Sequence, residues 1–205
     1  VTLTDGDDRP LAPEDLRPGE TYVFDYPFRS TPCFLLDLGQ PLSGGQTLET
    51  ADGLRYRWRG GIGPGRSVVA YSAICSHKLT YPDPRISFID YREEPARFTA
   101  NDEATAQRKG VIYCCSENSV YDPTAGARVL GGPAPQPLAA ILLEQGPRGE
   151  LQAAGVYGGS VFDRFFERFG FRLEMESGSE AREEVTGKSR AVPIGRYSGR
   201  VVHCG

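Results

Sequence analysis

The sequence lacks a long apolar run. None of its segments approaches the roughly 20 consecutive apolar residues that a membrane-spanning helix requires. It also lacks a basic run, and its net charge is −4, so we expect no nucleic-acid partner. The start of the chain has no signal-peptide pattern. Because the chain begins at Val1, a signal or anchor outside this sequence stays an open alternative.

Segments with the period of an amphipathic helix are scarce as well. Turn-forming residues are abundant instead, with 25 glycines and 16 prolines among 205 residues. A chain of this length can bury a core without help from disulfides. These features predict a turn-rich, all-β protein organised as one domain with additions.

Alternating or apolar runs bounded by glycine and proline predict the strands. They cover 21–26, 32–38, 54–58, 67–74, 86–91, 111–113, 120–121, 128–130 and 138–143. Residues 78–110 form a long insertion, and we expect a short helix or loop in its charged part, 92–110. Residues 131–137 should be a rigid extended loop, because three prolines fix φ and restrict their neighbours.

The last part of the chain differs in character. Residues 161–169 have the period of a short amphipathic helix, with four phenylalanines on one face: Phe162, Phe165, Phe166 and Phe169. We interpret this face chiefly as a surface that docks on the core. The charged stretch 176–190 is expected to be mobile.

Five cysteines are present, and their odd number does not predict a disulfide framework. Cys114 and Cys115 are neighbours, and a disulfide between neighbours strains the backbone. Cys33 lies in an apolar strand and is expected to be a small buried hydrophobe. Cys204 is left either free or paired with Cys33 or with a spare cysteine at 114–115.

Two short motifs carry the chemistry of the chain. Cys75-Ser76-His77 comes directly after a buried strand, and Cys114-Cys115-Ser116-Glu117-Asn118 follows another. A Cys-x-His pair followed by a second cysteine box is the ligand pattern of an iron–sulfur centre in which thiolates hold one iron and imidazoles the other. The first motif is intact, whereas the second contains no histidine.

These motifs, in this order, resemble the Rieske iron–sulfur family, in particular its quinol-oxidising members, over roughly residues 20 to 145. Ser119-Val120-Tyr121-Asp122 resembles the Ser-x-Tyr-Asp that follows the second box, and 132–135 resembles the proline loop that covers the cluster. The resemblance implies an all-β, antiparallel β-sandwich at 1–160, with a small cluster-binding subdomain at about 71–138. Residues 161–205 would be a C-terminal extension.

Site roles follow from the resemblance. Cys75 and His77 would be ligands of a [2Fe–2S] cluster. Ser119 and Tyr121 would donate hydrogen bonds to sulfur and raise the reduction potential. Pro133 and Pro135 would cover the cluster. The disulfide that usually ties the two loops is missing, because Thr80 and Ser116 stand at its positions.

The second pair of ligands can be read in two registers. Cys115 with Asn118 is preferred, because asparagine resembles histidine in size and needs one substitution from a Cys-x-x-His box. Counting back from Tyr121 gives Cys114 with Glu117 instead. Recruitment of His203, use of the spare cysteine and an empty site are further alternatives.

The resemblance implies a one-electron carrier, part of an oxidoreductase complex rather than a stand-alone enzyme. It would be a subunit of a respiratory or photosynthetic complex and pass electrons from quinol to a cytochrome. We expect it on the periplasmic side of a bacterial membrane, peripheral or anchored by a segment outside this chain. The alternative is a cluster-free scaffold in a membrane-associated complex. A ring-hydroxylating oxygenase is excluded, because its second iron site needs more than the two histidines present.

Overall fold

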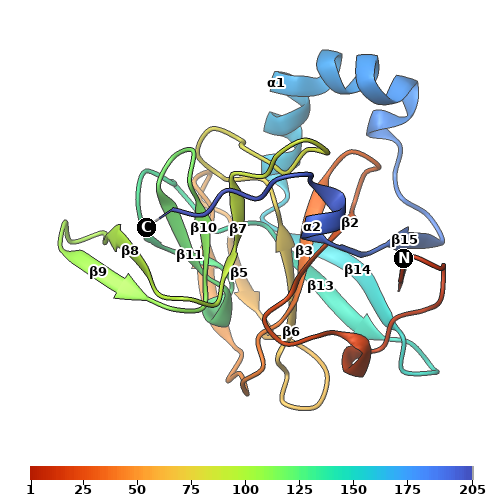
Figure 1. The fold of residues 1–205 in the computed structure, drawn as a ribbon, viewed down its shortest axis with the longest axis horizontal. Helices are drawn as coiled ribbons and strands as arrows, with labels where there is room; N and C mark the ends of the chain where they lie inside the picture. The colour runs from red at the N-terminus through yellow and green to blue at the C-terminus, as the bar shows by residue number, and fades with distance from the viewer. Residues whose placement is uncertain (205) are drawn as a thin grey trace.

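The computed structural model describes residues 1–204, with Ser177 described by its backbone alone. An eight-stranded sheet and a four-stranded sheet form the body of the molecule, with two further hairpins beside them (Figure 1). The predicted all-β fold class is confirmed. Within these residues, no helix is long and apolar enough to cross a bilayer.

The eight-stranded sheet has the order β15-β1-β14-β13-β6-β3-β2-β16. Its strands are β1 (Thr2–Thr4), β2 (Thr21–Asp25), β3 (Pro32–Asp37), β6 (Val68–Ser72), β13 (Ala140–Gln145), β14 (Leu151–Tyr157), β15 (Lys188–Arg190) and β16 (Val192–Pro193). Neighbouring strands are antiparallel except β1 and β15, which are parallel. Both edge strands, β15 and β16, therefore come from the C-terminal part of the chain, and β1 lies next to β15.

The four-stranded sheet has the order β12-β11-β10-β7. Its strands are β7 (Ile89–Arg92), β10 (Val111–Cys114), β11 (Ser119–Asp122) and β12 (Arg128–Gly131). One hairpin joins β4 (Gln46–Glu49) to β5 (Arg55–Trp58), and the other joins β8 (Ala96–Thr99) to β9 (Thr105–Arg108).

The β8–β9 hairpin projects from the body on the side opposite β15 (Figure 1). It occupies the charged part of the insertion, where a short helix or loop was expected, so that prediction is wrong. Ala96 and Phe98 are buried while Arg97 and Thr99 are exposed, which is the period of a strand covering a small cluster with Tyr113. The charged residues on either side made this alternation hard to recognise in the sequence.

Two α-helices and three 3₁₀ turns complete the fold. They are α1 (Ser160–Ser177), α2 (Ile194–Tyr197), η1 (Pro13–Asp15), η2 (Pro123–Ala125) and η3 (Gly178–Arg182). The phenylalanine-rich helix is confirmed, and it continues eight residues past its expected end at 169. The stretch 176–190, expected to be mobile, contains η3 and β15.

The central strand β3 separates two hydrophobic layers. Cys33 and Leu35 pack on the side that carries α1, in one cluster with Phe165. Phe34 and Leu36 point to the other side, toward the four-stranded sheet. Because both faces of β3 are covered, its sequence is apolar from Pro32 to Leu36 rather than alternating. The candidate motifs lie at the end of β6 and at the β10–β11 turn.

Truncation of Phe165 is expected to cost about 3–5 kcal/mol of unfolding free energy. This side chain is fully buried, and its ring packs edge-to-face against Tyr81 at 4.9 Å between centroids. Phe171 on the same helix is 80 % exposed, so F171A serves as the matched control and should change stability by less than about 0.5 kcal/mol. Urea unfolding measures both. Equal destabilisation by F165A and F171A would contradict the docked orientation of α1.

Candidate functional site

The first motif lies on a tight turn just after β6. The backbone N–H of Cys75 donates to the carbonyl of Thr80 at 2.8 Å, and the N–H of Leu79 donates to the carbonyl of Cys75 at 3.0 Å. Cys75 is fully buried, whereas the side chain of His77 is 28 % exposed. The turn thus directs the thiol inward and places the imidazole at the protein surface.

The second motif joins β10 to β11 as a hairpin. Cys114 pairs with Ser119, and residues 115–118 form the turn between them. Asn118 lies in the left-handed region with φ of +54° and is exposed. Asparagine is one of the few non-glycine residues that tolerate this conformation. Asn118 therefore shapes the turn, and its side chain faces solvent.

The structure brings the two buried thiols together. Cys75 and Cys114 are both fully buried and free of disulfides. Their mutual hydrogen bond lowers the pKa of Cys75 to about 6, against the opposing effect of burial. The same contact, together with burial, raises the pKa of Cys114. The opposite shifts of the two pKa values make Cys75 the thiol of the pair that more readily becomes a thiolate.

The two motifs also form a second pair of side chains, His77 from the first motif and Glu117 from the second. His77 Nδ1 is 3.3 Å from Glu117 Oε2, and Lys78 Nζ lies 3.3 Å from the same oxygen. The Nδ1 atom is buried and has no hydrogen-bond partner among residues 1–204, because its approach to Glu117 is not aligned as a hydrogen bond. The imidazole and the carboxylate are therefore adjacent and able to turn toward a common ligand.

Cys115 is not part of this group, which corrects the preferred register of Cys115 with Asn118. Cys115 forms a disulfide with Cys204, with an S–S distance of 2.13 Å. Successive residues of a strand point to opposite faces, so Cys114 faces the core while Cys115 faces the C-terminal segment. His203 is not recruited either, since its Nε2 lies 3.2 Å from Asp90 Oδ2.

Hydrogen-bond donors surround both sulfurs. The Tyr121 hydroxyl is 3.2 Å from Cys75 Sγ, and the backbone N–H of His77 also favours the thiolate of Cys75. The backbone N–H groups of Glu117 and Ser116 do the same for Cys114. Burial raises the pKa of Tyr121, so its hydroxyl keeps the proton that it can donate. Such donors stabilise negative charge on sulfur.

The buried Ser119 hydroxyl also lies close enough to Cys75 to lower the pKa of that thiol. Even so, Ser119 Oγ has no hydrogen-bond partner of good geometry in the described part of the chain. A buried hydroxyl without a partner is costly, and its position beside the thiols leaves it able to donate to an acceptor placed there.

The proline segment 131–137 contacts both motifs. A Cβ on Gly132 would lie 2.1 Å from the carbonyl oxygen of Asn118, so only glycine allows this close approach. The carbonyl of Gln136 accepts a 2.7 Å hydrogen bond from Ser76 Oγ. Pro133 and Pro135, expected as the cover, are themselves exposed, whereas Gln136 is buried. Gln136 could not be identified from the sequence, because a glutamine carries no signal that its backbone carbonyl will bind the first motif.

The donor set fits a two-iron cluster better than a single metal ion. Within residues 1–204, no group of three or more His, Cys, Asp and Glu side chains is placed to hold one ion. A [2Fe–2S] cluster needs two protein donors on each iron rather than three around one point. The thiol pair at 75 and 114 and the pair of His77 with Glu117 match that division. The unpartnered Nδ1 of His77 and Oγ of Ser119 add to the fit.

Comparison with solved structures yields a partial likeness. No family model matches the chain. The chain is similar to the solved structure of the soluble domain of the Rieske protein II (soxF) from Sulfolobus acidocaldarius, with 24 % sequence identity and a TM-score of 0.44. The match covers 67 % of this chain and 68 % of that one. The proposals below rest on the geometry of the site and not on this likeness.

Proposed function

We propose that the chain is a one-electron carrier of the Rieske type that holds a [2Fe–2S] cluster. Cys75 and Cys114 would bind one iron, and His77 and Glu117 the other. The bound cluster would supply a site that accepts and releases a single electron. The observation that carries the proposal is the pairing of donors, thiol with thiol and imidazole with carboxylate, each pair drawn from both motifs.

Glu117 would distinguish this centre from one with two imidazoles. A carboxylate brings a negative charge to the iron, which favours the oxidised state and lowers the reduction potential. Lys78 lies 3.3 Å from the Glu117 carboxylate and offsets part of that charge. The hydrogen bonds from Tyr121 and the His77 amide act in the opposite direction, because they stabilise the reduced, more negative cluster.

His77 would provide the route for the electron to a partner. Its side chain is 28 % exposed, while both thiols are buried, so the imidazole edge is the part of the site that another protein can contact. We propose a cytochrome or similar redox protein as acceptor and a quinol as donor. We also propose that the protein works on the periplasmic side of a bacterial membrane, in a respiratory or photosynthetic complex.

Iron and labile-sulfide content of the purified protein tests the proposal directly. We expect two irons and two sulfides per chain, a brown colour, and a rhombic EPR signal with low average g after reduction by dithionite. A colourless protein that also fails to take up a cluster on reconstitution with iron and sulfide would sink the proposal. That result would favour the alternative of a cluster-free scaffold subunit.

The hydroxyl of Tyr121 tests the tuning of the site. Y121F removes a donor 3.2 Å from Cys75 Sγ and should lower the reduction potential by roughly 50 mV, the equivalent of about 1 kcal/mol for one electron. Tyr113 donates instead to the carbonyl of Arg97, so Y113F is the control and should leave the potential unchanged. Protein-film voltammetry measures both. The same shift in the two variants would argue against a specific bond to sulfur.

A further inference from the structure

The two loops of the candidate site have no covalent link to each other within residues 1–204. Thr80 and Ser116 stand at the positions where the sequence indicated a missing clamp, and Cys75 and Cys114 are free. Without this clamp the two loops would be looser unless the insertion at 78–110 packed across them. The structure places a different segment against both loops, namely the C-terminal segment 160–204.

The helix α1 holds the first loop. Arg164 Nη2 lies 3.4 Å from the carbonyl oxygens of both Ser76 and His77, so one guanidinium donates to two successive peptides. The next residue, Phe165, packs edge-to-face against Tyr81. Leu79, which lies between these contacts, is buried in the same hydrophobic cluster as Phe165. The loop is therefore fixed by polar contacts at its start and aromatic contacts at its end.

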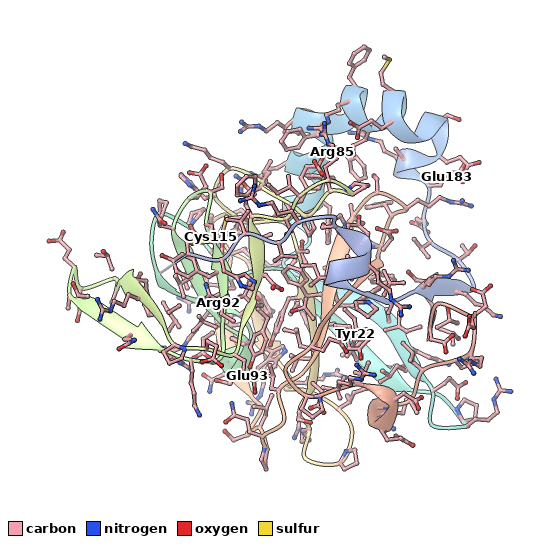
Figure 2. The ribbon with its side chains drawn as sticks, viewed as in Figure 1. Tyr22, Arg85, Arg92, Glu93, Cys115 and Glu183 are labelled. Atoms are coloured by element: carbon pink, nitrogen blue, oxygen red, sulfur yellow. A yellow bond between two sulfur atoms is a disulfide. The ribbon has the colours of Figure 1, made fainter. Side chains whose placement is uncertain are left out.

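The C-terminal strap, residues 198–204, holds the second loop. The strap runs beside the segment that leads into β7: the N–H of Val202 donates to the carbonyl of Ser87 at 2.8 Å. Arg92 Nη1 donates to the carbonyl of Cys204 at 2.6 Å. The disulfide from Cys204 then reaches Cys115, the residue after the candidate ligand Cys114. Figure 2 shows Cys115 at this end of the four-stranded sheet, near the end of the chain.

We propose that the C-terminal segment is a two-point clamp for the candidate site, in which Arg164 is the positioning residue of the first loop and Cys204 that of the second. Arg164 orients the peptide that carries His77, and the disulfide limits the freedom of the turn that carries Glu117. The clamp takes the place of a direct link between the loops. That the clamped site holds a cluster rests on the proposed function, but the contacts of Arg164 and Cys204 with the two loops do not.

Amide hydrogen exchange, followed by mass spectrometry on the protein without cluster, tests the clamp separately from the cluster. In R164M, exchange in residues 76–81 should accelerate by roughly tenfold, while 115–118 stays unchanged. R168M is the matched control, because Arg168 lies over the ring of Phe169 at 5.4 Å and makes no contact with the loop among the described residues. R164K should restore part of the protection, since lysine keeps a donor but loses the two-pronged geometry.

The double variant C115S/C204S tests the second contact and avoids leaving a reactive thiol. Exchange should accelerate by roughly tenfold in residues 115–118 and stay unchanged in 76–81. In cluster-loaded protein, each variant should broaden the EPR lines, and R164K should narrow them again relative to R164M. If R164M fails to fold, R164K against R168K measures the same contact.

The outcomes separate the clamp from the proposed function. Equal exchange at 76–81 in R164M and R168M, or unchanged exchange at 115–118 in C115S/C204S, overturns the clamp whatever the iron content. If the wild-type protein takes up no iron even on reconstitution, while the variants show these exchange patterns, the proposed cluster is overturned and the clamp is supported. Accelerated exchange over the whole chain in both R164M and C115S/C204S would also overturn the clamp, because such a pattern indicates general destabilisation.

Discussion

C114S should abolish the visible spectrum and leave less than about one tenth of the wild-type iron. Cys114 and Cys75 are both buried and each shifts the pKa of the other, and the pair supplies both thiolates for one iron in the proposed centre. A serine hydroxyl at this position cannot replace a thiolate, because it holds its proton at neutral pH. Iron analysis and absorption spectra of protein reconstituted under argon measure the effect.

The adjacent cysteine is the matched control for this result. C115S/C204S removes the disulfide but leaves Cys75 and Cys114 in place, so iron should be retained at more than about half of the wild-type content. Retention in C114S together with loss in C115S/C204S would reverse the assignment of the second motif. Loss in both would show that the strap is needed to hold the cluster, and C75S would then have to identify the thiolates.

E117H should raise the reduction potential by on the order of 100 mV or more. The substitution exchanges an anionic oxygen donor 3.3 Å from His77 Nδ1 for a neutral imidazole, and a neutral ligand stabilises the oxidised state less than an anionic one. E117A should instead lose the cluster, because it leaves one iron with a single protein donor. Redox titration followed by EPR measures the potential of E117H and the cluster content of E117A.

Asn118 provides the control for Glu117. N118H places histidine at the position preferred from the sequence, but this residue is exposed and in a left-handed conformation, whereas both thiols are buried. The potential of N118H should therefore stay within about 20 mV of the wild type, less than the effect of one hydrogen bond. A larger rise in N118H than in E117H would restore the register of Cys115 with Asn118.

The two registers of the second motif illustrate the limit of sequence reasoning. Both pairs of residues have the same spacing, and the choice depends on which of two adjacent cysteines faces the core. A shift of one residue in a strand exchanges its two faces. The strand β10 is buried between β7 and β11, and Cys114 is the residue turned toward the core packed against β6. Nothing within the motif itself carries that information.

The disulfide partner of Cys115 could not be identified from the second motif either. A bond between Cys115 and Cys204, 89 residues apart in sequence, requires the strap to return along β7. The sequence left this pairing open among several for Cys204. The contact of Arg164 with the first loop could not be predicted from the sequence either. It depends on how α1 docks and not on the helix period that predicted α1.

Local chemistry within the sequence was enough to determine the fold class, most strands, the docking face of α1 and the placement of both motifs on loops after strands. Alternation, turn residues and a row of phenylalanines act over a few neighbouring positions, and so they are readable without coordinates. Tertiary structure alone decided which side chains meet: Cys75 with Cys114, His77 with Glu117, and Cys115 with Cys204. These contacts join segments that only the packing of the two sheets and the return of the C-terminal segment bring together.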